Sequence, residues 1–395
     1  MPTKTESLFC CPLCKGVLTV SSGAPSSSSG GASSGFACGV CGREYPEIAG
    51  IVDFRICEDP YIDIPADRAK ALRIAGKADA LTFEQLVAFY YSITPEVPDD
   101  LGRHYLNHHV AGVKRGEGIL NRMQSYQLSK QAMPGVDLLD LGCGTGGFLA
   151  AASAKGASCV GADIALRWLV IARSRFRDLN CRDITLVCAC ADHLPFAENS
   201  FDAILAENLL EHCRDTTSVL AEVKRISRKS GAFLARTINR YAMGPEPHVG
   251  VWGVGYLPRS LMNGYVKLVK GIPYEHIHLE SFGSLNRAIE AVCGSQNRSA
   301  EAICGSPNQS TASIDSADAV TRCQLATKVP LITEADYAHH PKWKQCLFKL
   351  YTAMMRMPIL GASMAHLGPY IDIVSPPVSE AKTINPVQNK NAIYN

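Results

Sequence analysis

The stretch LLDLGCGTGGFL, residues 138–149, decides the fold of this chain. A short apolar run ends in a turn that contains Gly142, Gly144 and Gly147, and an alanine-rich helical pattern follows. These glycines fit the loose G-x-G-x-x-G spacing of loops that join a strand to a helix and bind a nucleotide. Such a loop does not distinguish a dinucleotide from another nucleoside ligand, so the rest of the sequence has to decide.

The region around this loop alternates short apolar runs with helix-like segments. The apolar runs are residues 136–142, 157–164, 184–192, 201–208 and 231–238. We interpret them as five buried parallel strands, with the first two crossover helices over 146–156 and 165–176. We therefore predict an α/β fold with a Rossmann-like doubly wound sheet, which binds its ligand beyond the carboxyl ends of the strands.

Acidic residues at the ends of these predicted strands indicate the charge of the ligand. Asp140 precedes the glycines, where a carboxylate would repel a pyrophosphate but suits a cationic ligand. Asp163 ends the second run and is placed to accept hydrogen bonds from both hydroxyls of a ribose, as an acid there also does in dinucleotide enzymes. Asp192 follows the third run, within ADHLPFAENSFDAILAENLLEH, residues 191–212.

Together, the loop, the spaced acids and the LPF…SFD pattern resemble the class I S-adenosylmethionine-dependent methyltransferases, in particular the subgroup typified by quinone-biosynthesis methyltransferases. The resemblance covers residues 136–238. It implies S-adenosylmethionine as the cofactor, held by Asp140, Gly142, Gly144, Gly146, Asp163, Ile164, Asp192, His193 and Glu207. It places Asp140 near the ammonium group, Asp163 on the ribose and Asp192 on the exocyclic amine of adenine. The backbone amide of His193 is expected on the adenine ring.

The N-terminal region carries two C-x-x-C pairs, each followed by glycine within two residues. The four cysteines are Cys11, Cys14, Cys38 and Cys41. This spacing predicts a tetrahedral structural zinc site with no open position. Cys10 competes with Cys11, but only Cys11 has the two-residue spacing to Cys14. CGREYPEIAGIVDF resembles the small zinc-ribbon family that includes the activator subunit of several RNA and protein methyltransferases. The serine-rich insertion 21–35 departs from the compact form of that family.

Residues 239–271, rich in glycine, proline and aromatic residues, are predicted to form a lid over the pocket of the methyl acceptor. His248 is a candidate general base, or else a lid histidine without chemistry. Glu207 should lie near the transferring methyl group, with His212 a turn further on as a second candidate base or as an ordinary helix-start residue. Trp252, Tyr256 and Arg259 are the other lid candidates.

Three features outside the predicted lid are candidates for contact with a ligand, a metal ion or a membrane. Tyr90 and Tyr91 either cap the cofactor or pack in the core. His104 and His108 have a helical spacing that suits a metal, but no third ligand accompanies them. An amphipathic helix within 343–363 packs on the sheet or rests on a membrane surface, where it would favour a lipid-like acceptor.

Two functions fit these patterns. The first is methylation of a small molecule or lipid-like intermediate by in-line transfer. The second is methylation of RNA or protein, with the zinc ribbon docking the substrate or partner and with RWLVIARSRFRD and KRISRK as basic stretches. The fourth run ends in ENLLEH rather than in the N-P-P-Y pattern of enzymes that methylate amino groups of bases or glutamine. A net charge of +2 does not indicate a nucleic-acid binder. We therefore favour the small molecule.

A chain of 395 residues is long enough for two or three domains. We predict a zinc ribbon (1–57), a helical linker or cap (58–131), the cofactor-binding core (132–245), a lid insertion with the C-terminal completion of the sheet (246–375) and a disordered tail (376–395). Residues 290–300 are nearly repeated by 301–312, which we interpret as a duplicated surface loop. The N-terminus lacks a signal-peptide pattern and no apolar run suits a membrane span, so we expect a cytoplasmic protein.

Overall fold

The computed structural model describes residues 8–22, 34–128, 133–294, 325–330, 342–355 and 366–375. Most of the serine-rich insertion, most of the 290–312 duplication and the whole predicted tail lie outside these described residues.

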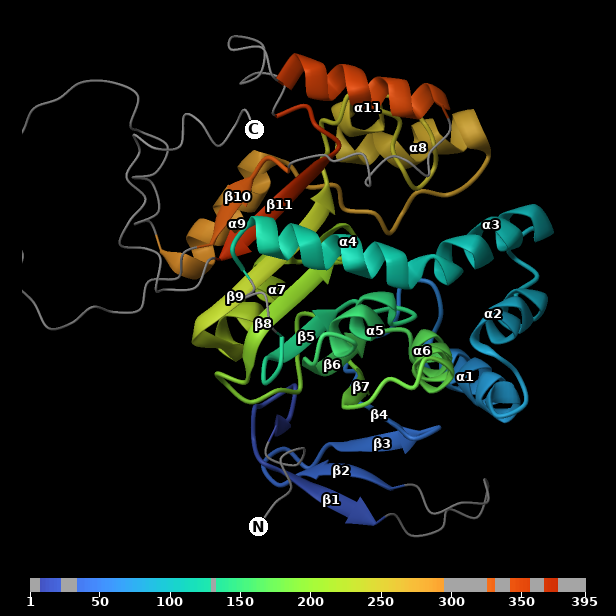
Figure 1. The fold of residues 1–395 in the computed structure, drawn as a ribbon, viewed down its shortest axis with the longest axis vertical. Coiled ribbons are helices and arrows are strands. Elements are labelled where there is room, and N and C mark those ends of the chain that lie inside the picture. The colour runs from blue at the N-terminus through green and yellow to red at the C-terminus, as the bar shows by residue number, and fades with distance from the viewer. Residues whose placement is uncertain are drawn as a thin grey trace, which may run out of the picture.

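One mixed sheet runs through the molecule, with the strand order β1-β2-β3-β4-β7-β6-β5-β8-β9-β11-β10 (Figure 1). The central strands are β5 (Asp137–Leu141), β6 (Ser158–Asp163), β7 (Ile184–Cys188), β8 (Phe201–Glu207) and β9 (Ser227–Ile238). All neighbours among these five pair in parallel, which confirms the predicted fold class. The last strand pairs, β11 (Tyr370–Ser375) with β9 and β10 (Ala326–Lys328) with β11, are antiparallel.

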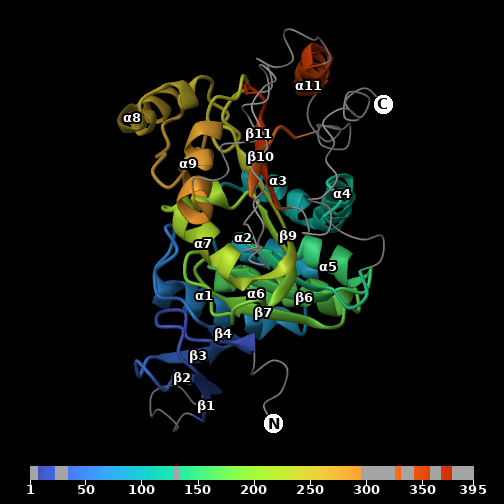
Figure 2. The ribbon, with the colours of Figure 1, turned by 90° about the vertical axis from the view of Figure 1, so that its left-hand side faces the viewer.

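Helices cover both faces of this sheet (Figure 2). The crossover helices are α5 (Gly147–Ser153), α6 (Leu166–Asp178) and α7 (Thr216–Ile226). The predicted helical region after residue 58 forms α1 (Ile64–Ala78), α2 (Phe83–Ser92), α3 (Asp99–Val110) and α4 (Gly112–Ser125). Helices α1 and α2 pack on α6, and α4 packs on α5. Helix α9 (Phe282–Cys293) packs on α7, over a separate core on the other face.

Helix α4 lies directly on the first turn of α5 because glycines meet at the crossing. A Cβ on Gly116 would lie 2.8 Å from the carbonyl oxygen of Gly147, and a Cβ on Gly147 would lie 2.5 Å from the carbonyl carbon of Gly112. Only side chains without a Cβ permit this approach of two backbones. The crossing brings the N-terminal helices next to the glycine loop.

The strands of the N-terminal region continue the sheet of the core. Its strands are β1 (Leu18–Ser22), β2 (Ser34–Cys38), β3 (Glu44–Ile48) and β4 (Ile51–Asp53), and β4 pairs in parallel with β7 of the core. The ring of Phe9 lies 5.3 Å from that of Phe54 and 6.0 Å from that of Phe196, so both regions share one hydrophobic core.

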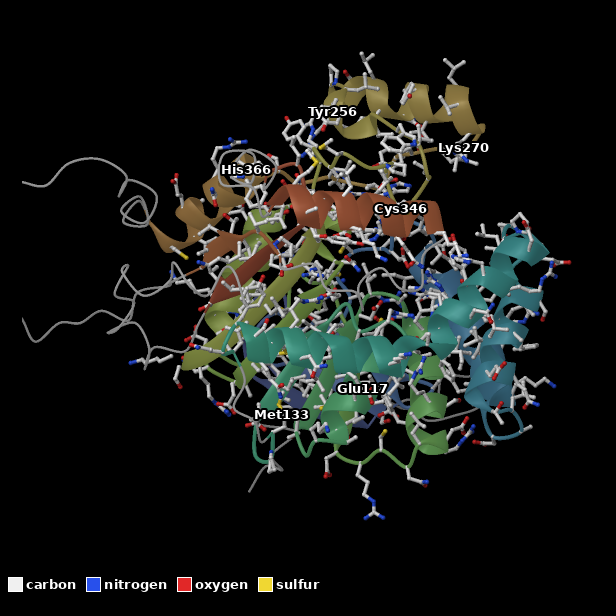
Figure 3. All side chains as sticks on the ribbon, turned by 45° about the horizontal axis from the view of Figure 1, so that its top comes forward. Glu117, Met133, Tyr256, Lys270, Cys346 and His366 are labelled. Carbon is white, nitrogen blue, oxygen red and sulfur yellow. The ribbon has the colours of Figure 1, made fainter. Side chains whose placement is uncertain are left out.

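Helices α8 (Arg259–Lys270) and α11 (Lys342–Met355) lie at the end of the molecule opposite β1–β3 (Figures 1 and 2). Figure 3 shows Tyr256, Lys270 and Cys346 at this end, and Glu117 on α4 nearer the centre. Helix α11 confirms the start of the predicted amphipathic helix, whose last residues lie outside the described part. Among the described residues, no helix has both the length and the apolar character needed to cross a membrane.

Candidate functional site

The glycine loop between β5 and α5 has the backbone shape that its sequence predicts. Gly142, Gly144 and Gly146 have φ values of 78°, 49° and 70°, in the left-handed region that glycine adopts without strain. A Cβ on Gly146 would also lie 2.4 Å from the ring of Phe176. The loop therefore offers bare backbone at the carboxyl end of the sheet, where the predicted ligand binds.

Asp163 joins the end of β6 to this loop. One carboxylate oxygen accepts a hydrogen bond from the amide of Gly144 and the other from the amide of Ala165, both at 2.8 Å. Each oxygen keeps a further lone pair, so the carboxylate can still accept hydrogen bonds from ribose hydroxyls. Burial raises its pKa above the ordinary value, although these two amides oppose the shift.

A second buried carboxylate, Asp140, lies behind the loop with little exposure. Burial raises its pKa well above the ordinary value, and the neighbouring carboxylates of Asp163 and Glu207 raise it further. Glu207 ends β8 and forms an ion pair with Arg122 of α4. The carboxyl edge of the sheet thus concentrates acidic groups, whose ionised forms would be favoured by a ligand that carries an ammonium group and a sulfonium.

Asp192 and His193 lie after β7, at the predicted adenine end of the site. The carboxylate of Asp192 lies 3.2 Å from Nδ1 of His193, and both side chains are partly exposed. The backbone amide of His193 donates to the carbonyl oxygen of Cys190 at 3.1 Å. The backbone amide of His193, which is expected to bind the adenine ring, is therefore hydrogen-bonded within a turn in this structure.

The predicted acceptor residues come together as one polar cluster. The imidazoles of His212 and His248 have ring centroids 5.1 Å apart. Ligand atoms of both histidines and of Glu211 lie within 4.8 Å of one another. His248 Nδ1 lies 2.6 Å from a carboxylate oxygen of Glu246, so the carboxylate orients the ring and leaves Nε2 for another partner.

The protonation preferences of this cluster differ from residue to residue. The pKa of His212 is lowered to about 4, mainly by burial and in part by the neighbouring His248. Burial also acts to lower the pKa of His248, but the carboxylate of Glu246 outweighs it and raises that pKa. Burial raises the pKa of Glu211 to about 7. One oxygen of Glu211 accepts from Thr237 at 2.8 Å, and the other is buried without a partner among the described residues.

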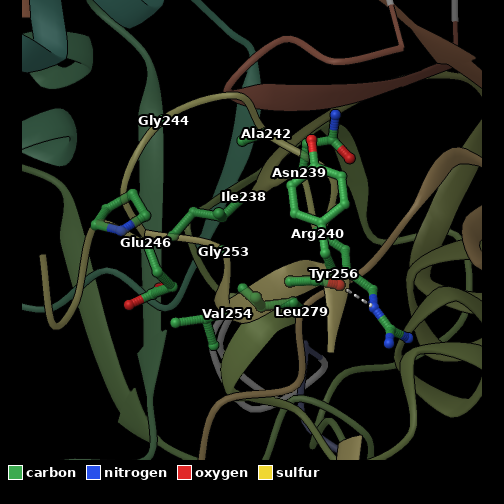
Figure 4. Close-up of a pocket in the computed structure, with 12 residues that line it drawn as sticks. Ile238, Asn239, Arg240, Ala242, Gly244, Glu246, Gly253, Val254, Tyr256 and Leu279 are labelled. Atoms are coloured by element: carbon green, nitrogen blue, oxygen red, sulfur yellow. Dashed lines mark hydrogen bonds between the residues drawn. The ribbon is translucent and has the colours of Figure 1, made fainter. Parts of the chain in front are cut away.

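The segment predicted to be a lid is held by Arg240, which donates to the carbonyl oxygens of Gly255 (2.9 Å) and Leu257 (2.8 Å). A small pocket lies here between Ile238 at the end of β9 and Tyr256 of the lid (Figure 4). Of the other lid candidates, Trp252 and Tyr256 are about half exposed, and Arg259 donates to the carbonyl oxygen of Leu279 at 3.1 Å. No bound ligand tests these residues, so their roles stay predictions.

The two tyrosines of α2 have different surroundings. Tyr90 is buried, with its ring 4.3 Å from that of Trp168, in agreement with core packing. Tyr91 has its hydroxyl 3.2 Å from Nε2 of His109, whose Nδ1 lies 3.3 Å from the hydroxyl of Thr145 in the glycine loop. Within the described ranges, the clusters of potential metal ligands do not include His104 or His108.

Sequence reasoning missed four residues of the site. They are His109, Arg122, Glu211 and Glu246. For Glu246 a signal was present, because it stands two residues before His248 in EPH. Arg122 reaches Glu207 only through the crossing of α4 over the sheet, which no local pattern reveals.

The four predicted cysteines form a cluster in the N-terminal region. The sulfur atoms of Cys11 and Cys41 lie 3.7 Å apart, those of Cys14 and Cys38 lie 3.4 Å apart, and all four lie within 4.8 Å of one another. Sulfur atoms about 2.3 Å from a tetrahedral zinc ion are separated by roughly 3.8 Å, so the arrangement fits that ion. The thiol of Cys10 points away and donates to the carbonyl oxygen of Phe196 at 3.1 Å.

A glycine loop at the carboxyl edge of a parallel sheet, with carboxylates at the ends of several strands, is the arrangement expected of a class I S-adenosylmethionine-dependent methyltransferase domain. Residues 139–235 match the family model described as methyltransferase domain. The match covers the part of the chain that carries this arrangement.

Several methyltransferases are similar to part of this chain. Residues of the chain are 31% identical over 146 residues to the demethylmenaquinone methyltransferase of Corynebacterium urealyticum, covering 37% of this chain and 59% of that protein. They are 35% identical over 150 residues to the ubiquinone biosynthesis O-methyltransferase of Paracidovorax citrulli, covering 35% and 59%. The sterol 4-C-methyltransferase strm-1 of Caenorhabditis elegans is 25% identical over 154 residues, covering 38% and 46%. The chain thus spans less than two thirds of the length of these relatives.

Proposed function

We propose that this protein transfers the methyl group of S-adenosylmethionine to a small-molecule or lipid-like acceptor bound under the lid. The observation that carries the proposal is the group of carboxyl groups at the glycine loop, Asp140, Asp163 and Glu207, of which Asp140 is buried. A cationic cofactor would favour their ionised forms. The names of the relatives support a small acceptor, since they include quinone and sterol methyltransferases.

When bound, the cofactor supplies an activated methyl group on a sulfonium. The residues of this chain would orient the two reactants and exclude water. His212 and His248 lie side by side, and we assign them to the acceptor side of the site. The carboxylate of Glu246 would prepare His248 to receive a proton at Nε2. An acceptor oxygen or nitrogen that carries a proton would use this histidine as its base.

The alternative of an RNA or protein substrate has less support from the basic stretches, because several of their arginines are engaged within the protein. In RWLVIARSRFRD, Arg167 and Arg175 are buried, and Arg167 is paired with Asp59 and Asp67. In KRISRK, Arg225 pairs with Glu222, and Arg228 pairs with the carboxylates of Asp137 and Asp202. These arginines stabilise the fold, so they do not form a free surface for phosphates.

The ribbon would hold one structural zinc ion. Its four thiolates fill the tetrahedral coordination sphere, so the metal would take no part in methyl transfer. The relation of this ribbon to the activator-subunit family stays a proposal that rests on the sequence CGREYPEIAGIVDF.

Binding of S-adenosylmethionine tests the proposed function directly. Asp163→Ala should weaken binding by about 1–3 kcal/mol, roughly tenfold to a hundredfold in Kd, because charged hydrogen bonds to the ribose are lost. Isothermal titration calorimetry measures this change. Asp202→Ala is the matched control, since Asp202 lies at the opposite end of the strands and pairs with Arg228. Equal affinity of wild type and Asp163→Ala would remove the ribose assignment.

The pH dependence of cofactor binding gives a second test. Asp140 and Asp163 have raised pKa values in the free protein, mainly because they are buried. A cationic ligand favours their ionised forms, so binding should release protons and tighten as the pH rises through these raised pKa values. Calorimetry in buffers with different ionisation enthalpies measures the proton release. Uncharged adenosine is the control and should show a weaker dependence, whereas a pH-independent Kd for the cofactor would contradict the charge argument.

His248→Ala should lower kcat by about 10²–10⁴-fold while leaving the Kd for S-adenosylmethionine unchanged. The physical reason is loss of the base at the acceptor, away from the glycine loop. Formation of S-adenosylhomocysteine with a panel of hydroxyquinones, catechols and sterols identifies an acceptor and then measures the variant. Glu246→Gln, which keeps the side-chain shape but weakens the bond to Nδ1, should give a smaller loss. Full activity of His248→Ala would assign this residue to the lid alone.

A further inference from the structure

Two cysteines far apart in the sequence meet beside the predicted adenine acid. The sulfur atoms of Cys57 and Cys190 lie 2.8 Å apart, closer than the pairs of the zinc cluster at 3.4 and 3.7 Å. Cys57 is exposed, whereas Cys190 is buried with 2% exposure. Neither thiol belongs to the four-cysteine cluster or to the polar cluster around His212 and His248.

Sheet pairing holds this pair together. Asp53 of β4 is in register with Cys188 of β7, and the amide of Phe54 donates to the carbonyl oxygen of Cys188 at 2.8 Å. Because the two strands are parallel, the segments that follow them cross the same edge of the sheet. Cys57 and Cys190 belong to these two segments, so their approach is set by the fold and needs no rearrangement of the chain.

We propose that Cys57 and Cys190 are a redox-active pair, a modification site that a low-molecular-weight disulfide such as glutathione disulfide converts to an intramolecular disulfide. The bond would attach the segment that leaves the ribbon to the loop that carries Asp192.

The reaction proceeds by two thiol–disulfide exchanges. The thiolate of the exposed Cys57 attacks one sulfur of glutathione disulfide, forms a mixed disulfide and releases one glutathione thiolate. The thiolate of Cys190 then attacks the Cys57 sulfur and releases the second glutathione. The protein loses two protons and two electrons, and one glutathione disulfide becomes two glutathione thiols, so the exchange is balanced.

The disulfide would restrain the adenine end of the cofactor site, an effect that rests on the proposed function. Asp192 lies two residues after Cys190, in the turn closed by the bond from His193 to the Cys190 carbonyl oxygen. On the other side, Asp59 is held by Arg167 at 2.9 Å, so the segment around Cys57 is anchored. A turn attached to this anchor cannot adjust to adenine, and we expect S-adenosylmethionine to bind about threefold to tenfold more weakly to the oxidised protein.

Peptide mapping tests the modification itself. The full-length zinc-loaded protein is equilibrated with glutathione disulfide, alkylated and digested with trypsin. Cys57 falls in the peptide 56–68, and Cys190 falls in 183–214 together with Cys188 and Cys213. The proposal expects a linked pair of these peptides, assigned to Cys190 by fragmentation and reversed by dithiothreitol. Absence of this link, or a link through Cys188 or Cys213, would overturn it.

Cofactor affinity is measured on the same samples. Cys57→Ser and Cys190→Ser should lose the response to oxidant, whereas the control Cys213→Ser should keep it, since Cys213 bonds to the carbonyl oxygen of Leu209 and not to Cys57. Zinc content is followed in parallel, because a response that persists in Cys57→Ser would come from the ribbon thiols and would count against the pair. If the reduced wild type fails to bind S-adenosylmethionine, the proposed function fails while the peptide link still decides the modification.

Metal analysis separates a disulfide from a second metal site. Cys57, Cys190 and Asp192 also have ligand atoms within 4.8 Å of one another. A second zinc ion per chain that is lost in Cys57→Ser would overturn the redox proposal in favour of metal binding.

Discussion

Replacing Arg55 with methionine is expected to destabilise the protein by about 3–5 kcal/mol, because it leaves buried carboxylates without a counter-charge. The guanidinium donates to both oxygens of Asp53 and to one oxygen of Asp67, each at 2.8 Å, and all three side chains are fully buried. It also donates to the carbonyl oxygen of Ile164 at 3.0 Å, directly after Asp163. The same substitution should therefore weaken cofactor binding as well as folding.

Denaturant unfolding and calorimetry measure these two effects of Arg55→Met. Arg73→Met on the exposed face of α1 is the matched control and should change the free energy of unfolding by less than about 0.5 kcal/mol. Burial would raise the pKa of Asp53, but Arg55 and Arg68 hold it below the ordinary value. The stabilisation from Asp53 is thus present above the unfolded-state pKa and is lost as the pH falls through the lower folded-state value. The difference in free energy of unfolding between wild type and Arg55→Met should therefore become smaller at acidic pH. If Arg55→Met is as stable as wild type at neutral pH, the argument is contradicted.

The strands of the core could be predicted because each contains a short apolar run, and the first four runs have an acid or a glycine at or near the carboxyl end. Asp140, Asp163 and Glu207 appear at the same edge of the sheet because parallel strands share one direction. The same logic predicted the cysteine cluster from spacing, since two C-x-x-C pairs bring four sulfurs together only if their hairpins face each other.

The network around Arg55 could not be predicted in this way. Its partners come from β4, from α1 and from the loop after β6, which meet only because β4 adds to the edge of the core sheet. A three-residue strand such as β4 carries too little periodicity to indicate its pairing partner. The polar cluster around His212 and His248 was likewise predicted only in part. Glu211 and Glu246 join the two histidines through tertiary packing, which the sequence does not reveal.

Removal of zinc is expected to have the largest effect on stability, since the free energy of binding a structural zinc ion, about 10 kcal/mol or more in small domains, is also folding free energy. The strands of the ribbon are short, and the sulfur cluster joins the loop before β1 to the turn after β2. Without the metal, the four cysteines would take up protons and no ion would join the two C-x-x-C segments. We expect β4 to detach from β7, which would expose Phe9 and Phe54 and withdraw Arg55 from the loop after β6.

Native mass spectrometry and thermal unfolding of Cys38→Ser measure this outcome, with less than one zinc ion per chain and a lower Tm expected. Cys10→Ser is a stringent control, because Cys10 is next to Cys11 but bonds to the carbonyl oxygen of Phe196, which a serine hydroxyl can also reach. It should keep its zinc. Because Arg55, which follows β4, contacts the loop after β6 that follows Asp163, a chelator should weaken S-adenosylmethionine binding before the core unfolds. Equal zinc content in wild type and Cys38→Ser would show that the four sulfurs do not hold a metal. Any coupling between the N-terminal region and cofactor binding would then have to come from β-sheet pairing alone.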